Sequence, residues 1–390
     1  MNTNSPTLCI VGGGQLGFLL CSAARELGIT TVVVTNDADA PALGIADHSL
    51  VTTLDAPDLA STIADQSDVV TFEFEAVSDR LLAGLVEQER AGKIAVRPGV
   101  DVMTLIKSKI RQKQWYVDHD LPTLEFVATE APREELESVI ERSGLPFVQK
   151  AAGGGYDGYG GQVIRSRSDL DQVWDTPSIF EPCLADPTEL AVVVARSTSG
   201  ECVAYHPVEM VFDPVRNVLD NMVSPAMQNE RVQADALALA LEAVRQLDGV
   251  GVFAVEMFLR PDDGLVINEV SPRVHNSGHH TLDAYDHSQF EQHVRACCGL
   301  PLAPMNADVR PAVMVNLLFE DRLAPLMGLP AGPVQCVDEG VHLHWYGKLE
   351  ARPGRKMGHI TCLDKDLENG MRRIDLALDA LTRNIDEAVA

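Results

Sequence analysis

Short apolar runs and polar turns alternate along the first third of the chain in the pattern of an open α/β fold. The runs are short and rich in β-branched residues, so they predict buried strands, whereas the segments between them have helical spacing. The predicted strands are 7–11, 30–35 and 69–72, and the predicted helices are 16–27, 80–90 and 108–119. Strands that alternate with helices in this way indicate a doubly wound parallel sheet.

From residue 123 onward the elements become shorter and the connections more irregular. The predicted strands are 147–150, 179–184, 190–195, 312–319 and 341–346, and the predicted helices are 230–247 and 364–389. A chain of 390 residues is long enough for two or three domains. The shorter elements after residue 123 indicate that the domain with the parallel sheet is only the first of them.

Two apolar runs, 250–259 and 265–270, flank an Asp-Gly turn and predict a β-hairpin. Glu256 and Glu269 interrupt these runs, and a turn at residues 262–263 places them opposite each other on one face, with Cβ atoms roughly 5 Å apart. Carboxylates this close repel each other and are costly to bury unpaired. We therefore expect them to hold a divalent cation, typically Mg²⁺ bound also to nucleotide phosphates. The alternative is a pair of solvated glutamates with arginine partners.

The loop after the hairpin, 272–279, carries side chains that bind anions and metals. These side chains are Arg273, His275, Asn276 and Ser277. His275 and His279 also have the spacing of zinc ligands on a helix. Gly278 argues against a helix there, and a third soft ligand is absent from the neighbouring sequence, so zinc is disfavoured.

Two glycine-rich turns have the composition of phosphate-binding loops. The first, 12–17, matches G-x-G-x-x-G between a strand and a helix, which predicts an anion at the helix N-terminus. Asp37, near the end of the second strand, keeps a nicotinamide nucleotide open as an alternative ligand. The second turn, 151–162, follows Lys150 and can fold its N–H groups over phosphates, the alternative being a solvent-exposed hairpin tip.

Composition and charge restrict the partners. The net charge of −26 argues against nucleic-acid binding, since phosphate backbones are met by basic surfaces. The cysteines form no C-x-x-C pair and predict reduced core thiols in a cytoplasmic protein, and the sequence has neither a signal-peptide pattern nor an apolar run long enough for a membrane span. Five basic or imidazole side chains within 348–359 of this acidic chain predict a second anionic ligand group.

Six sequence motifs point to one family. They are GGGQLG at 12–17, TFEFE at 71–75, KSKIRQKQ at 107–114, GGYDG at 154–158, SPRVHNSGHHT at 271–281 and HWYGKLEARPGRKMGHI at 344–360. Together with the glutamate pair they resemble the ATP-grasp superfamily, and within it most closely the 5-(carboxyamino)imidazole ribonucleotide synthase family. The resemblance covers nearly the whole chain, and the last two motifs are its most specific part.

The resemblance implies an α/β ATP-grasp fold with three domains. These are a doubly wound pre-ATP-grasp domain at 1–107, an ATP-grasp domain at 108–305 with a lid subdomain at about 123–185, and a small C-terminal domain at 306–390. The implied reaction is ATP- and bicarbonate-dependent carboxylation of the 5-amino group of 5-aminoimidazole ribonucleotide. It passes through carboxyphosphate and gives the N5-carbamate in de novo purine biosynthesis. The family also implies Mg²⁺, or Mn²⁺ in its place, and a homodimer.

The resemblance also implies roles for individual residues. The implied ATP-binding residues are Lys109, Lys150, Glu181, Leu184 and Glu189, and the implied metal ligands are Glu256 and Glu269. The implied catalytic residues are Arg273, His275 and Asn276, at the γ-phosphate and bicarbonate, with Asp157 and Lys348 handling the amine proton. The implied ribonucleotide-binding residues are Gln15, Leu16, Glu73, Tyr156, Ser277, Lys348 and Arg355.

The glycine loop departs from the family pattern. After GGYDG the family carries arginine or lysine before Gly-Gln, whereas this chain has Tyr159 and one extra residue. Three alternative functions stay open. They are another ATP-grasp ligase or a formyl-transferring relative with a related phosphorylated substrate, a nicotinamide-dependent dehydrogenase that uses the first glycine turn and Asp37, and, because of the altered loop, a nucleotide-binding regulator without turnover.

Overall fold

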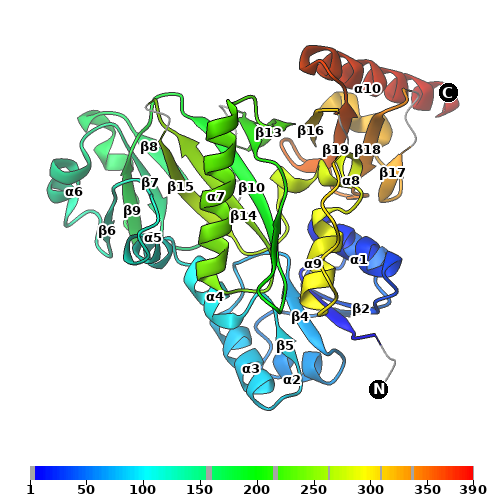
Figure 1. Ribbon diagram of the computed structural model, residues 1–390, viewed down its shortest axis with the longest axis horizontal. Helices are drawn as coiled ribbons and strands as arrows, with labels where there is room; N and C mark the ends of the chain where they lie inside the picture. The colour runs from blue at the N-terminus through cyan, green and yellow to red at the C-terminus, as the bar shows by residue number, and fades with distance from the viewer. Residues whose placement is uncertain are drawn as a thin grey trace.

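The N-terminal strands form a parallel sheet in the order β3-β2-β1-β4-β5. The structure is a computed structural model that describes residues 5–154, 160–213, 218–261, 264–307, 310–334 and 338–389 (Figure 1). The strands are β1 (Leu8–Val11), β2 (Thr31–Thr35), β3 (His48–Val51), β4 (Val69–Phe72) and β5 (Ala95–Val96). Every residue of β1, β2 and β4 is buried, which is why these strands appear in the sequence as continuous apolar runs.

Helices cover both faces of this sheet. The local helices are α1 (Gln15–Glu26), α2 (Leu59–Ala64), α3 (Asp79–Arg90) and α4 (Val100–Ile106). Helices α2 and α3 pack on one face. On the other face, Phe18 and Leu20 of α1 share a core with Phe290 and Val294 of the distant helix α9 (Gln289–Cys297). The parallel sheet is therefore joined to the rest of the molecule through an apolar core.

A small antiparallel sheet follows in the order β6-β9-β7-β8. Its strands are β6 (Val127–Thr129), β7 (Phe147–Ala151), β8 (Gly161–Ile164) and β9 (Ser178–Pro182), and it is accompanied by α6 (Leu136–Ser143). Phe147 and Phe180 meet edge to face at 5.2 Å in its core, and Val139 of α6 packs with them. The apolar face of this sheet is thereby buried without help from the larger sheet.

The largest sheet runs in the order β15-β14-β10-β12-β13-β16-β19-β18-β17, with β11 paired to β10. The central strands are β10 (Thr188–Arg196), β11 (Cys202–Ala204), β12 (Val208–Phe212), β13 (Leu219–Ser224), β14 (Gly251–Leu259) and β15 (Leu265–Ser271). The C-terminal strands are β16 (Ala312–Leu318), β17 (Gly332–Val334), β18 (Val341–Trp345) and β19 (Lys356–Leu363). The small C-terminal domain thus continues the central sheet, because β16 pairs with β13.

The long helices cover this sheet. Helix α7 (Glu230–Leu247) packs on one face of β10 and β14, α9 packs on the opposite face, and α10 (Leu367–Val389) covers the C-terminal strands (Figure 1). The remaining helices are α5 (Lys109–Asp118), α8 (Thr281–Ala284) and the 3-10 helices η1 (Pro41–Gly44), η2 (Arg167–Gln172), η3 (Asn276–Gly278) and η4 (Asp321–Leu326). None of the helices in the described ranges is both long enough and apolar enough to cross a membrane.

The elements predicted from periodicity all exist, with ends displaced by no more than about three residues. Helix α7 has the predicted bounds because Asn229 caps it, its side chain accepting a hydrogen bond from the Val232 N–H, and because Asp248 leaves the helix at φ 54°. The loop from His275 to His279 contains only the 3-10 turn η3, so the prediction that this loop is not an α-helix is confirmed. The strands β3, β12 and β17 were not predicted; β3 is mostly exposed and β17 has only three residues, so neither forms a continuous apolar run.

Candidate active site

Glu256 and Glu269 are directly paired across β14 and β15, so the predicted pairing is confirmed. The register slips by one residue immediately afterwards, because Asn268 is an extra residue in β15. Both Asn268 and Glu269 therefore stand opposite Glu256, and both line the same small cavity. Lys150 Nζ donates a hydrogen bond of 2.7 Å to Asn268 Oδ1. The sequence analysis missed Asn268, a polar residue next to the second glutamate in an apolar strand.

Three lysines surround the acid pair. Lys109, the first residue of α5, forms an ion pair with Glu269 through its Nζ atom. Lys113 Nζ and Lys150 Nζ lie 2.5 and 2.6 Å from the two carboxylate oxygens of Glu181. Burial opposes ionisation of Glu181, which is 1% exposed, but the charges of Lys150 and Lys113 outweigh it and keep the pKa below its usual value. The Glu181 side chain thus holds two lysines in place.

The pKa values of the acidic groups in this site are shifted in different directions. Burial, followed by the charge of Glu269, raises the pKa of Glu256 well above its ordinary value. The ammonium group of Lys109 holds the pKa of Glu269 well below its usual range. Burial also raises the pKa of Glu189, in β10, to about 7. Three neighbouring carboxyl groups of which two resist ionisation make an environment that favours a cation.

The loop after β15 connects the acid pair to the N-terminal sheet. Arg273 forms an ion pair of 2.9 Å with Glu75, which follows β4, and His275 Nε2 lies 3.2 Å from Glu256 Oε1. His275 Nδ1 is hydrogen-bonded to the Ser277 hydroxyl at 2.9 Å. Asn276 is 9% exposed, and both polar atoms of its amide lack a hydrogen-bond partner among the described residues. A buried amide of this kind is available to a ligand.

The first glycine turn binds a carboxylate of the protein itself. Glu73 accepts hydrogen bonds from the N–H groups of Gly14 at 2.6 Å and Leu16 at 3.1 Å, at the N-terminus of α1. A Cβ on Gly12 would lie 2.5 Å from Glu73 Cβ, so the glycine is required for this close approach. The prediction of an anion at the helix N-terminus is corrected accordingly: in this structure that anion is Glu73. The same contact removes the main argument for a nicotinamide nucleotide there.

The basic C-terminal segment reaches the same turn. Lys348 Nζ donates hydrogen bonds to Gln15 Oε1 at 2.5 Å and to the Lys356 carbonyl at 2.7 Å. Arg355 lies 2.9 Å from the Glu350 carboxylate. Gln15, Leu16, Glu73 and Lys348 are therefore gathered at one place, although they lie at opposite ends of the chain.

Other predicted site residues lie apart from these contacts or outside the described part of the chain. Leu184 follows β9 and accepts a weak hydrogen bond from Cys183 Sγ through its carbonyl. Tyr156, Asp157 and Tyr159 lie outside the described residues, so the departure in the glycine loop stays a sequence observation.

Comparisons with known proteins agree with this architecture. Residues 114–290 match the ATP-grasp domain, residues 6–107 the ribonucleotide synthetase preATP-grasp domain, and residues 312–373 the phosphoribosylaminoimidazole carboxylase C-terminal domain. The chain is therefore an ATP-grasp ligase.

Similarity over the full length gives the family. The N5-carboxyaminoimidazole ribonucleotide synthase of Synechococcus elongatus is 39% identical over 90% of this chain and 88% of its own length. A crystal structure of an N5-carboxyaminoimidazole ribonucleotide synthetase with ADP has a TM-score of 0.84 and 33% identity, covering 98% of this chain and 97% of the other. The synthase of Aspergillus clavatus in complex with ADP and 5-aminoimidazole ribonucleotide has a TM-score of 0.83 and 29% identity, covering 97% and 99%. The chain belongs to the N5-carboxyaminoimidazole ribonucleotide synthase family.

Proposed function

We propose that this ligase carboxylates the 5-amino group of 5-aminoimidazole ribonucleotide at the expense of ATP and bicarbonate, in de novo purine biosynthesis. The observation that carries the proposal is the loop from Arg273 to Ser277. It contacts the acid pair through His275 and the N-terminal sheet through Arg273, beside the turn where Gln15 meets Lys348. One short segment thus connects the two halves of a two-substrate site.

The ATP half is built around the lysines and acids. Lys109 and Lys150 supply the positive charge for the phosphates, while the backbone at Glu181 and Leu184 and the carboxylate of Glu189 receive the adenine and ribose. Glu256, Glu269 and the Asn268 carbonyl are the hard oxygen donors that Mg²⁺ or Mn²⁺ requires, and they face one another across the bulge. The bound cation would neutralise phosphate charge during phosphoryl transfer.

The loop from Arg273 to Ser277, here called the linking loop, binds the phosphoryl group that is transferred. Bicarbonate is a poor electrophile, and phosphorylation by ATP converts it to carboxyphosphate with release of ADP. Arg273, His275 and the unpartnered amide of Asn276 are placed to orient bicarbonate and balance charge as the phosphoryl group moves. Carboxyphosphate then releases carbon dioxide and phosphate, and the carbon dioxide is attacked by the amine.

The ribonucleotide half lies at the glycine turn. Gln15, Leu16, Glu73, Ser277, Lys348 and Arg355 would bind this substrate, together with Tyr156 of the glycine loop. Attack of the amine on carbon dioxide leaves one proton to be removed, and Asp157 with Lys348 is the pair proposed to manage it.

The organisation of the chain follows the same proposal. We assign the pre-ATP-grasp domain to 1–107, the ATP-grasp domain to 108–305 with its lid at about 123–185, and the C-terminal domain to 306–390. A homodimer in the cytoplasm is the expected state of such a biosynthetic enzyme.

Phosphate release from ATP tests the proposal. The purified chain should release phosphate rapidly only when bicarbonate and 5-aminoimidazole ribonucleotide are both present, and an N5-carbamate should form in equal amount. Equal stimulation by unrelated amines, or release that does not depend on bicarbonate, would reassign the enzyme to another ATP-grasp reaction. ATP binding without turnover would instead indicate a regulator.

A further inference from the structure

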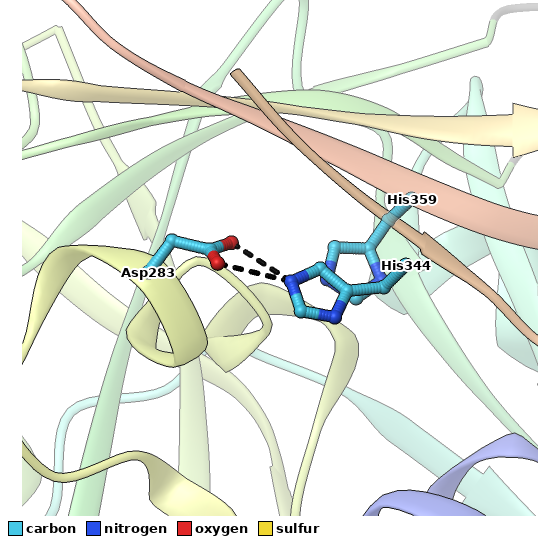
Figure 2. Close-up of side chains that lie close together, drawn as sticks. All are labelled: Asp283, His344 and His359. Carbon is cyan, nitrogen blue, oxygen red and sulfur yellow. Dashed lines mark hydrogen bonds and ion pairs between the residues drawn. The ribbon is translucent and has the colours of Figure 1, made fainter. Parts of the chain in front are cut away.

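A second group of metal-ligand side chains lies between α8 and the β18–β19 hairpin. His344 and His359 are direct cross-strand partners, and their rings stack at 4.6 Å between centroids with 9° between planes. Asp283 in α8 faces them, with its oxygens 3.0 and 3.1 Å from His344 Nε2. Figure 2 shows the carboxylate pointing at the edge of the His344 ring, with the His359 ring behind it. Two imidazoles and a carboxylate are thus brought together from separate elements.

His359 provides an observation independent of this proximity. Its side chain is fully buried, and its Nδ1 atom is hydrogen-bonded to the Tyr346 hydroxyl at 2.8 Å. Its Nε2 atom has no hydrogen-bond partner in the described part of the chain. A metal-binding histidine has this arrangement when Nδ1–H donates to the Tyr346 hydroxyl, because the lone pair of Nε2 is then left for the ion. As a purely structural contact, the same arrangement leaves a buried polar atom unpaired.

The dimensions of the group suit a small ion. One ligand atom from each of Asp283, His344 and His359 can be chosen so that all three lie within 4.8 Å of one another. Two donors of a tetrahedral zinc ion are separated by about 3.3 Å, given metal–ligand bonds of about 2.0–2.1 Å. The 3.0 Å contact between Asp283 and His344 is close to this separation, whereas the His359 ring must turn out of its stack with His344 for its nitrogen to point at the same ion.

We propose that Asp283, His344 and His359 form a binding site for one divalent transition-metal ion of the Zn²⁺ or Co²⁺ type. Two nitrogen donors and one oxygen donor favour these ions over Mg²⁺, which prefers oxygen ligands. When the ion binds, it takes the place of the hydrogen bond between Asp283 and His344 Nε2. The proton on Nε2 of His344 then moves to Nδ1 of the same ring. His342 lies on the same face of β18, two residues before His344, with its Nδ1 3.7 Å from Asp283 Oδ1 and a side chain 44% exposed. It marks the side from which the ion enters.

The position of the site gives it a structural role that does not depend on the proposed reaction. Helix α8 follows the loop that carries Arg273 and His275, whereas β18 leads through Tyr346 into Lys348. The Tyr346 hydroxyl binds His359, and the Lys348 ammonium group lies 5.5 Å from the centre of the Tyr346 ring. An ion held between α8 and β18–β19 therefore ties the linking loop to the segment that carries Lys348.

Metal titration tests the site in the full chain. Chelator-treated protein should be titrated with Co²⁺ in excess Mg²⁺, which saturates oxygen-only sites, while the visible absorption of the cobalt ion is recorded. One equivalent should bind with a tetrahedral-type spectrum, and Zn²⁺ should displace it. His359→Gln and Asp283→Asn should each weaken Co²⁺ binding by at least about tenfold. The matched control is His287→Gln, which removes another histidine bound to a carboxylate, at 2.9 Å from Glu291.

The outcomes are decisive in both directions. Absence of the cobalt spectrum in the wild-type chain, or equal binding by the two cluster variants and the wild type, would overturn the site. Loss of binding in the His287 control alone would place the ion elsewhere and overturn it as well. If His359→Gln fails to fold, Asp283→Asn, which keeps the size of the side chain, decides the question, with circular dichroism and ADP binding as checks on its fold.

Discussion

Lys109 and Glu269 form an ion pair at the edge of the cavity where β15 carries its bulge. The ammonium group occupies the side of the carboxylate on which a bound cation is proposed. On the proposed assignment, ATP and its metal ion would draw Lys109 from the carboxylate toward the phosphates, so that Lys109 and Glu269 would exchange partners when the substrate binds.

Replacing Glu269 by glutamine should abolish most ATP turnover. The substitution removes a negative oxygen donor from the cation and a partner from Lys109, and we expect kcat to fall by about 10²–10³-fold. The rate of steady-state phosphate release at saturating Mg²⁺ measures this fall in kcat. Glu137→Gln is the control, since this glutamate is 72% exposed and pairs with Arg167 on the protein surface. Wild-type turnover in Glu269→Gln would contradict the assignment of the acid pair.

Replacing Lys348 by alanine should impair the use of the ribonucleotide and leave nucleotide binding unchanged. Its ammonium group contacts Gln15 and the Lys356 carbonyl, far along the chain from the lysines around Glu181. We therefore expect an unchanged Kd for ADP, together with a loss of about 10²-fold or more in turnover that depends on the ribonucleotide. Calorimetric ADP titration and phosphate release give the two values, and exposed Lys365→Ala serves as control. A collapse of ADP affinity would show that the division of the site is wrong.

The stability of the ligand-free protein should depend on pH through Glu189. Burial raises the pKa of this group to about 7, above its unfolded value of about 4.3, so the folded state binds the extra proton between these values. Stability contributed by the protonated form is complete below about pH 4.3 and is lost as the pH rises through about 7. Glu189→Gln keeps a neutral side chain at every pH.

The difference between Glu189→Gln and the wild type is the measured quantity. The variant should gain stability relative to the wild type as the pH rises from about 4.5 to about 7, by about 3–4 kcal/mol, and the difference should be constant above that range. Urea denaturation at a series of pH values measures it. A constant difference across the whole range would show that Glu189 titrates normally.

Replacing Gly12 by alanine should destabilise the N-terminal sheet. The added Cβ would lie 2.5 Å from Glu73 Cβ, and the backbone at Gly12 has φ +121°, which a side chain disfavours. We expect the free energy of unfolding to fall by about 2–4 kcal/mol. Gly44→Ala is the matched control, because a Cβ there meets no atom within 4 Å among the described residues. Equal stability of the two variants would contradict the close approach of Glu73.

Much of the fold and part of the site follow from the sequence. The pairing of Glu256 with Glu269 was predicted from the turn position, but the register beside the turn, Leu259 with Leu265, would by itself place Asn268 opposite Glu256, and the extra residue brings Glu269 there. The bulge at Asn268 could not be predicted, since the strand that accepts an extra residue is decided by contacts such as that with Lys150, which is 118 residues away. Sequence patterns report local geometry and leave such distant contacts undetermined.

The glycine turn illustrates the same limit. Its composition predicted a bound anion at the start of α1, because backbone N–H groups collect there, and the group that they bind is a side chain of the protein itself. The identity of that group depends on β1 and β4 lying side by side, which brings in a carboxylate 59 residues away. The ion pairs of Lys113 and Lys150 with Glu181 were not predicted for the same reason, since α5, β7 and β9 meet only in the folded chain.

The pairing of β13 with β16 limits how this protein can be divided. Removing the chain after residue 310 would leave β13 as an open edge, with N–H and C=O groups that β16 now satisfies exposed to other molecules. Exposed strand edges of this kind promote association between chains, so we expect the part of the chain before that boundary to associate with itself when it is produced alone.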